Sequence, residues 1–238
     1  MRNIDLDAER AYENKKVSGA EARATQSKYY WATSLEAERH LESIKKQVSG
    51  RIVLEIGCSS GSLASKISPL ADQYIGTDIS DKAIELASQK GLRNSRFLCC
   101  DGHSVPLEGE TVDVVIVDAL LHHMDLERAL REIARLLRPG GILFFNEPLG
   151  TNPLFQLYRR LTPQSRTVDE RPFTRMDLRT LRSFFEIQEF RWFGFTNIAS
   201  AFARNVRVRM ILTRIDRMIA LTPLRLFFWQ FSGSAVKK

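Results

Sequence analysis

The sequence predicts an α/β fold, a doubly wound parallel sheet with helices on both faces. Strand and helix patterns alternate along the chain, and the segment Val112–Val117 is nearly all apolar, as in a parallel strand covered on both faces. Several strands also end in an acidic residue, a third feature of such sheets when they bind a ligand. With 238 residues, 44% of them hydrophobic, the chain can bury a full sheet core as one domain over 1–238.

Residues 1–48 are predicted to form a polar helical segment that closes over a bound ligand as a lid. Tyr29, Tyr30 and Trp31 are its candidate substrate contacts. A second interpretation stays open, in which these aromatic side chains anchor the helix to the sheet. Because the first residues lack the apolar core of a signal peptide, we expect a cytoplasmic location.

The turn after the first strand is the most informative stretch. Residues 53–64 form an apolar run that ends in an acid and a glycine-bounded turn, and a helix follows. A dinucleotide fingerprint would have glycine where Ser59 and Ser62 stand, and Glu55 would repel a pyrophosphate. The turn therefore suits a ligand without phosphates. Its acid and its backbone N–H groups fit a zwitterionic amino-acid tail beside a cationic centre.

The next two predicted strands supply further acids at the same edge. The strand Gln73–Asp78 places Asp78 about 20 residues after the glycine turn, where a carboxylate accepts both hydroxyls of a ribose. The strand Ser95–Cys100 leads to Asp101 and Gly102. There a carboxylate accepts from an adenine amino group, and glycine allows close approach of the ring.

The pattern then continues through a complete strand, helix and strand. The strand Val112–Val117 ends at Asp118, and a helix is predicted over Asp125–Leu137. Arg138–Gly141 is a stop signal for that helix, and the strand Ile142–Phe145 follows. These residues define the core of the domain, over 49–147.

In this order and spacing, the motifs resemble those of the class I S-adenosylmethionine-dependent methyltransferases. They are Glu55–Gly61, Asp78, Asp101, Asp118–Asp125 and Leu137–Gly141. The resemblance implies a Rossmann-like seven-stranded sheet with an antiparallel last strand, and S-adenosylmethionine as cofactor. Ser59 stands where the family more often has glycine. The cofactor-binding residues implied are Glu55, Gly57, Cys58, Ser59, Gly61, Asp78, Ile79, Asp101, Gly102 and Asp118.

Candidate catalytic residues follow the fourth and fifth strands. His122 and His123 lie just after Asp118 and titrate near neutral pH, and Glu147 ends the fifth strand at the same edge. His123, His122 and Glu147 are therefore candidates for removing a proton from an acceptor hydroxyl, although a structural role for the histidines stays open. These groups also offer ligands for a divalent ion, but their spacing does not establish one, and a metal-free site is favoured.

The acceptor is less constrained. A net charge of +7 favours a nucleic-acid substrate, but the residues after Asp118 lack the Pro-Pro-aromatic motif typical of base-amino methyltransferases. The run from Leu121 to Asp125 instead resembles enzymes that act on quinones, sugars, lipids and natural products. We therefore expect methylation of a hydroxyl oxygen on a small molecule. The alternatives are a nitrogen or carbon acceptor, RNA or protein methylation, and cofactor binding without turnover.

Residues 148–238 are predicted to form the acceptor side and the last strands. Tyr158 is a further candidate substrate contact, and a helix over Thr174–Phe184 precedes a strand over Phe185–Phe195. The resemblance places a helical insertion before a last strand at about 227–236.

The segment 202–229 carries six arginines among apolar residues at the spacing of an amphipathic helix. It lacks the run of about 18 apolar residues that a membrane-spanning helix needs. Two interpretations stay open: peripheral contact with an anionic membrane, and packing on the domain itself or at a dimer interface. The oligomeric state, monomer or homodimer, is open for the same reason.

Overall fold

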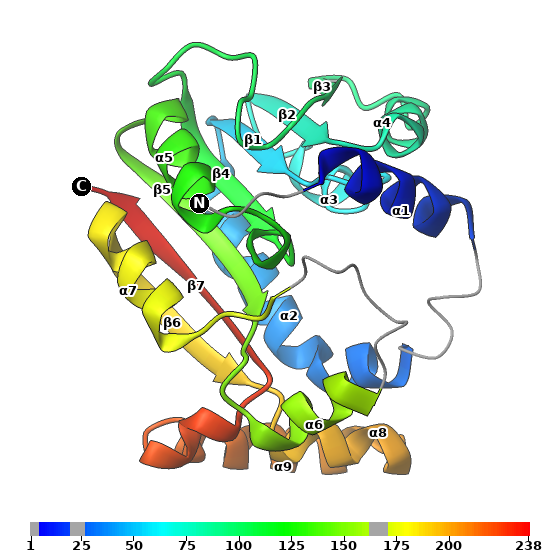
Figure 1. Ribbon diagram of the computed structural model, residues 1–238, viewed down its shortest axis with the longest axis vertical. Helices are drawn as coiled ribbons and strands as arrows, with labels where there is room; N and C mark the ends of the chain where they lie inside the picture. The colour runs from blue at the N-terminus through cyan, green and yellow to red at the C-terminus, as the bar shows by residue number, and fades with distance from the viewer. Residues whose placement is uncertain (1–4, 20–26, 162–170) are drawn as a thin grey trace.

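A seven-stranded mixed sheet forms the centre of the computed structural model, which describes residues 5–19, 27–161 and 171–238. The strand order is β3-β2-β1-β4-β5-β7-β6, and β7 runs antiparallel to both of its neighbours (Figure 1). The strands are β1 (Ile52–Ile56), β2 (Gln73–Asp78), β3 (Ser95–Cys99), β4 (Val112–Asp118), β5 (Leu137–Pro148), β6 (Phe185–Phe193) and β7 (Gln230–Lys237). The predicted fold class and the antiparallel last strand are confirmed.

Helices cover both faces of the sheet. They are α1 (Leu6–Ser18), α2 (Ser27–Val48), α3 (Ala64–Ile67), α4 (Asp81–Ser88), α5 (Leu126–Leu136), α6 (Pro153–Leu161), α7 (Arg175–Phe184), α8 (Ser200–Ala203) and α9 (Val206–Ile219). Successive strand residues point to opposite faces, so Val53 packs with α2 and α3 while Leu54 packs in the core that contains α5 and α7. The sheet is thus buried on both sides.

Helix starts follow the polar residues that the sequence places there. The Asp125 side chain accepts from the Arg128 N–H and begins α5, and Thr174 and Asp177 form a capping box that begins α7. The predicted helix over Thr174–Phe184 is therefore seen with Thr174 as its cap.

The strand β5 is longer than predicted. It was expected over Ile142–Phe145, after a loop, but pairing with β4 already begins at Leu137. The register jumps between the pairs Val112–Leu137 and Val114–Ile142, so the residues in between bulge out, with Gly140 in the left-handed region at φ 73°. The stop signal ends the helix as expected, but the chain returns to the sheet at once.

The C-terminal segment is divided differently from the prediction. Instead of one helix through 202–229, the structure has α8, then α9 capped by Asn205, then a 3₁₀ turn at Pro223–Phe227. The last strand begins at Gln230, whereas the prediction was 227. None of the described helices is long and apolar enough to cross a bilayer.

Candidate active site

A cleft of about 210 Å³ opens at the carboxyl ends of β1, β2 and β4, and α1 forms its opposite wall. This is the edge at which open α/β sheets bind ligands. Seven of the predicted cofactor-binding residues line the cleft. They are Gly57, Ser59, Asp78, Ile79, Asp101, Gly102 and Asp118.

Asp78 is held at the end of β2 by backbone donors. Its Oδ2 accepts from the Ser59 N–H at 2.8 Å, and its Oδ1 accepts from the Ser80 N–H at 2.9 Å. Burial raises the pKa of Asp78, and these two N–H groups oppose that rise. Ser59 reaches this position with φ at 45°, in the left-handed region. That conformation explains why glycine is the commoner residue there.

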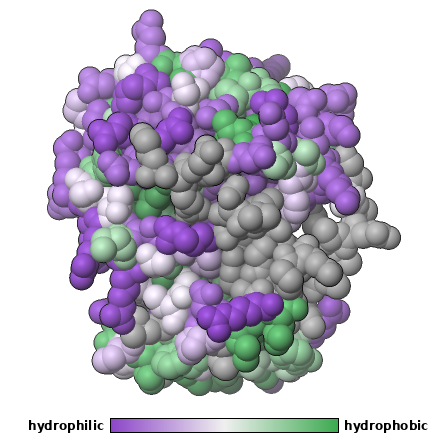
Figure 2. Space-filling view, in the orientation of Figure 1, coloured by the Kyte–Doolittle hydropathy of each residue, from purple (hydrophilic) through white to green (hydrophobic). Residues whose placement is uncertain are grey.

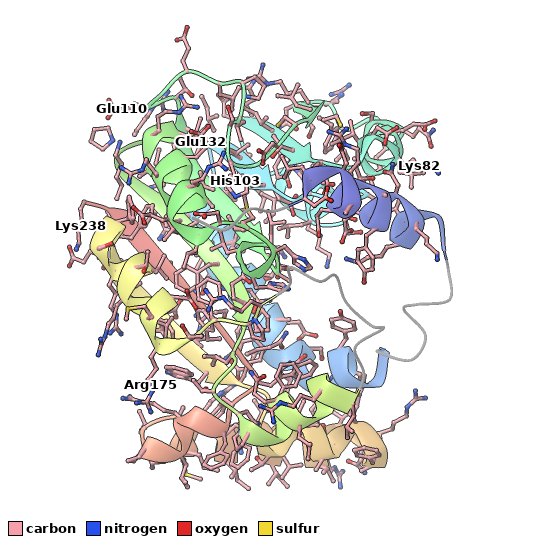
Figure 3. The ribbon with its side chains drawn as sticks, viewed as in Figure 1. Lys82, His103, Glu110, Glu132, Arg175 and Lys238 are labelled. Atoms are coloured by element: carbon pink, nitrogen blue, oxygen red, sulfur yellow. The ribbon has the colours of Figure 1, made fainter. Side chains whose placement is uncertain are left out.

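Asp101 is fixed by a histidine that the sequence did not single out. Its Oδ1 accepts from the His103 N–H at 2.9 Å and contacts Nδ1 of the His103 ring at 2.7 Å. The other ring nitrogen, Nε2, accepts from the Asp125 N–H at 3.0 Å, so Nδ1 carries the proton. His103 is labelled in Figure 3, close to α5. Although burial raises the pKa of Asp101, the bonds from His103 outweigh it and the pKa is lowered. His103 thereby couples the carboxylate to the start of α5.

Two glycines of the cleft are closely approached by neighbouring side chains. A Cβ at Gly102 would lie 2.8 Å from Ile56 and 2.9 Å from Met124. A Cβ at Gly57, where φ is 81°, would lie 2.9 Å from Leu120. A side chain would be strained by the positive φ at Gly57, and at Gly102 it would displace Ile56 or Met124. The surrounding side chains form an apolar wall of the cleft.

Glu55, Cys58 and Gly61 do not line the cleft. The Glu55 carboxylate is buried and accepts from the Tyr74 hydroxyl, and burial raises its pKa to about 8. Cys58 is buried, and burial raises the pKa of its thiol. Gly61, at φ 72°, allows close packing on Ala87 of α4. These three residues pack on the side of the turn away from the cleft, and none of them lines it.

The structure separates the two adjacent histidines. His122 is buried and its Nδ1 lies 2.7 Å from Oε2 of Glu147, a residue only 1% exposed. The Glu147 Oε1 accepts from the N–H groups of Leu120 and Leu121 at 3.1 and 2.8 Å. Burial raises the pKa of Glu147 to about 8, although these N–H groups oppose the rise. This pair fixes the 3₁₀ turn that carries His123, and neither member lines the cleft.

His123 lines the cleft and faces α1. Its Nδ1 lies 3.1 Å from Oε1 of Glu9, and its side chain is only 12% exposed. The rings of His122 and His123 are 4.2 Å apart. A carboxylate beside one ring nitrogen favours the proton there and leaves the other nitrogen as the basic one. Of the three predicted catalytic residues, His123 alone combines a basic group with access to the cleft.

Asp118 ends β4 at the floor of the cleft. Its Oδ1 accepts from the Asn146 side-chain amide at 2.7 Å. The residue is exposed toward the opening, yet enough protein surrounds the carboxyl for desolvation to raise its pKa to about 6. The next residue, Ala119, is strained at φ 53°. Across the described ranges, His, Cys, Asp and Glu side chains form no group of three suited to a metal ion.

The helix α1 supplies cleft residues that sequence reasoning missed. Glu9, Glu13 and Lys16 all line the cleft, and the Lys16 Nζ contacts the Glu13 carboxylate at 2.8 Å. The helix is docked through Arg10, whose Nε donates to the Ile79 carbonyl at 3.1 Å. Its charged residues resemble a solvated surface in the sequence, so only tertiary contacts reveal them as a wall.

The predicted aromatic substrate contacts are not found in the cleft lining. The side chains of Tyr29 and Tyr158 lie outside the described part of the structure. Tyr30 is 60% exposed, and the Trp31 ring packs under the Arg209 guanidinium at 4.5 Å. Trp31 therefore contacts α9, and this contact is neither with the cleft nor with the sheet to which the second interpretation assigned it.

Comparison with known proteins gives partial matches. A family model described as a methyltransferase domain matches residues 54–145. The uncharacterized methyltransferase YcgJ of Bacillus subtilis is 34% identical over 94 residues, which cover 37% of this chain and 37% of that protein. A ubiquinone biosynthesis O-methyltransferase of Coxiella burnetii is 29% identical over 112 residues, which cover 44% of this chain and 48% of that protein. The chain thus spans less than half the length of these curated relatives.

A solved structure extends the likeness beyond the matched domain. The geranyl diphosphate C-methyltransferase of Streptomyces coelicolor A3(2), in complex with Mg²⁺, geranyl diphosphate and S-adenosyl-L-homocysteine, has a TM-score of 0.65 at 14% identity. The likeness covers 86% of this chain and 80% of that chain, and at this identity it shows the fold alone. The methyltransferase-domain match over residues 54–145, together with the order of motifs and this fold, supports a class I S-adenosylmethionine-dependent methyltransferase.

Proposed function

We propose that this protein transfers a methyl group from S-adenosylmethionine to a hydroxyl oxygen of a small-molecule acceptor. One observation carries the proposal. His123, backed by Glu9, lies in the wall of the same cleft that holds Asp78 and Asp101. A base and a nucleoside-binding edge therefore share one enclosed space.

The polar groups of the cleft fit the cofactor. Asp78 is fixed at the end of β2 and would accept from ribose hydroxyls, and Asp101 would accept from an adenine amino group. Gly102 leaves room for the ring beside Ile56 and Met124. When bound, S-adenosylmethionine supplies an activated methyl group on a sulfonium, so the protein has mainly to orient the acceptor and remove its proton.

The His123 ring would take that proton. With Nδ1–H directed at Glu9, the lone pair is on Nε2, and the Glu9 carboxylate stabilises the imidazolium once the proton has moved. Glu147 and His122 act behind it by holding the turn in place. The helix α1 covers this part of the cleft and would exclude water during the reaction.

The acceptor that fits best is a small, partly apolar molecule. Leu6, Leu120 and Met124 contribute apolar surface beside His123. The named relatives point the same way, because their names refer to ubiquinone biosynthesis and to geranyl diphosphate. Quinols, catechols and isoprenoid or polyketide alcohols are therefore the acceptor classes to try first.

Paired histidine variants test the proposal. Each protein is assayed for methyl transfer against a panel of these acceptors and for S-adenosylhomocysteine affinity by calorimetry. For His123→Ala we expect the rate to fall by about 10²–10⁴ with cofactor affinity unchanged. For His122→Ala we expect mainly a loss of stability. A full rate in His123→Ala would favour an acceptor that needs no base, and cofactor binding without any turnover would favour a non-catalytic role.

A further inference from the structure

We propose that α9 and its flanking turns form a docking surface for an anionic lipid bilayer. The surface, here called the α9 outer face, consists of Arg207, Met210, Ile211, Arg214, Met218 and Leu221. This inference does not depend on the acceptor or on methyl transfer, because it concerns a face of the molecule distinct from the cleft.

The inward face of α9 carries buried polar groups beside the partly buried Leu212, Ile215 and Ile219. The Asp216 side chain is 1% exposed and accepts from the Thr196 N–H at 2.7 Å. Arg209 donates to the Ser34 hydroxyl at 2.6 Å, and Arg217 donates to Glu36 at 2.7 Å. The residues that would normally face water therefore hold α9 against the rest of the protein.

A second set of apolar residues on α9 and the turn after it points outward. Met210, Ile211, Met218 and Leu221 lie along one side at helical spacing and are 43–87% exposed. Hydrophobic residues gather along the lower edge of the molecule, the region of α9 (Figure 2). A contiguous exposed apolar strip on a helix marks a surface that binds something.

The positive charge around this strip indicates an anionic partner. Residues 200–229 contain six arginines and a single acid, Asp216, which is turned inward. Arg204, Arg207 and Arg214 are exposed, and in the described part of the structure they form no ion pair. Apolar side chains flanked by arginines match the interface of an anionic bilayer, with the chains in the acyl boundary and the guanidinium groups among the phosphates.

A second copy of the chain fits this face less well. A symmetric dimer through the α9 outer face would bring Arg207 and Arg214 against the same residues of the partner, with no acid to compensate. Nucleic acid is also disfavoured, because phosphate contacts need no exposed strip of Met, Ile and Leu.

Vesicle co-sedimentation of the full chain tests the proposal. The probes are vesicles of phosphatidylglycerol mixed with phosphatidylcholine, and vesicles of phosphatidylcholine alone. We expect binding to the anionic vesicles only. For Arg207→Ala/Arg214→Ala we expect binding about 30-fold weaker, since each arginine near an anionic surface contributes about fivefold. For Ile211→Ser/Met218→Ser we expect a loss of about tenfold or more.

Matched controls separate docking from general electrostatics. Arg93→Ala/Arg96→Ala removes the same charge from exposed positions at the β3 edge, and Leu86→Ser removes an exposed apolar residue from α4. Both should bind as the wild type does, within about twofold. Failure of the wild type to bind anionic vesicles would overturn the proposal, as would an equal loss in the control pair. A dimer in sedimentation equilibrium that Ile211→Ser/Met218→Ser dissociates would assign the face to a second copy instead.

Discussion

Acidic side chains serve different purposes in the two halves of this molecule. In the cleft half, Asp78 and Asp101 are oriented by neighbouring donors while still lining an open space. In the half built from α2 and α9, Asp216 and Glu36 are buried. Asp216 accepts from the Thr196 N–H and Glu36 accepts from Arg217, so each carboxylate joins two segments of the chain. The first arrangement leaves hydrogen-bond acceptors available to a ligand, and the second joins chain segments through buried polar bonds.

This difference separates residues whose loss should affect binding from residues whose loss should affect folding. A carboxylate that faces a cleft can be removed at little cost to the fold, because water replaces it. A carboxylate that satisfies several buried donors cannot, because each donor is left without a partner.

The largest effect is expected for Asp216→Ala. This change leaves several buried donors unsatisfied, and the free energy of unfolding should fall by about 3–5 kcal/mol in urea denaturation. The donors concerned are the N–H groups of Phe195, Thr196 and Asn197 and the hydroxyl of Thr196. Asp78→Ala is the matched cleft variant and should lose about 1 kcal/mol or less. Equal losses in the two variants would break the comparison.

The next effect is a pH dependence of stability that arises from Glu55. Burial raises the pKa of Glu55 from 4.5 to about 8 in the folded state, so folding binds a proton as the pH rises past the unfolded pKa. Its stabilising contribution is therefore complete below about pH 4.5 and decreases up to about pH 8. The slope is about 1.4 kcal/mol per pH unit.

Urea denaturation across that pH range measures the slope. Glu55→Gln should flatten the curve, and a residual slope of the same sign should remain, because the pKa of Glu147 is also raised to about 8. An unchanged slope in Glu55→Gln would mean that Glu55 does not carry the proton.

A smaller effect is expected for His103, which positions Asp101. In His103→Ala the carboxylate loses its contact with Nδ1 and the Asp125 N–H loses its acceptor. We expect calorimetric affinity for S-adenosylhomocysteine to fall by about tenfold, the effect of one charge-assisted hydrogen bond. Because Asp101, which His103 positions, is proposed to bind the adenine and not the acceptor, the rate at saturating cofactor should stay close to the wild-type value. A fall in that rate without a change in affinity would contradict this role.

The smallest effect is expected for Ser59→Gly. Glycine relieves the left-handed strain of Ser59, which is about 1 kcal/mol, but it adds entropy to the unfolded chain. The net gain in stability should be under about 1 kcal/mol, read as a small rise in Tm. Ser60→Gly is the control, since Ser60 has no positive φ, and it should lower Tm. A lower Tm for Ser59→Gly than for Ser60→Gly would mean that the left-handed φ of Ser59 does not destabilise the protein.

The cleft half could be predicted from sequence because its information is local. The ends of β2 and β4 were expected within one residue, and the acids that follow the strands were expected at the ligand edge. Glu55 was expected among the cofactor-binding residues, but it does not line the cleft. Successive residues of a strand point to opposite faces, and it is the neighbouring Ile56 that lines the cleft. The separate roles of His122 and His123 depend on Glu147 and Glu9, which are distant in sequence.

The second half could not be predicted in detail because its contacts are long-range. The arginines of α9 read as one basic amphipathic helix, yet Arg209 and Arg217 bind residues of α2 more than 170 positions earlier in the chain. Hydrophobic periodicity identifies a helix but not which side is buried, and in α9 the most buried residues are the polar Thr213 and Asp216. The contact between Trp31 and Arg209 is another long-range contact that local sequence patterns do not indicate.

The most direct test of the cleft assignment is calorimetric titration of S-adenosylmethionine and S-adenosylhomocysteine into the wild-type protein and into Asp78→Ala. We predict micromolar binding of both ligands to the wild type, and a loss of at least about 100-fold in a variant that melts at nearly the same temperature, since the carboxylate would bind two ribose hydroxyls. Equal affinity in the two proteins would contradict the assignment of Asp78 to the cofactor, and absence of binding to the wild type would contradict the account of the cleft as a whole.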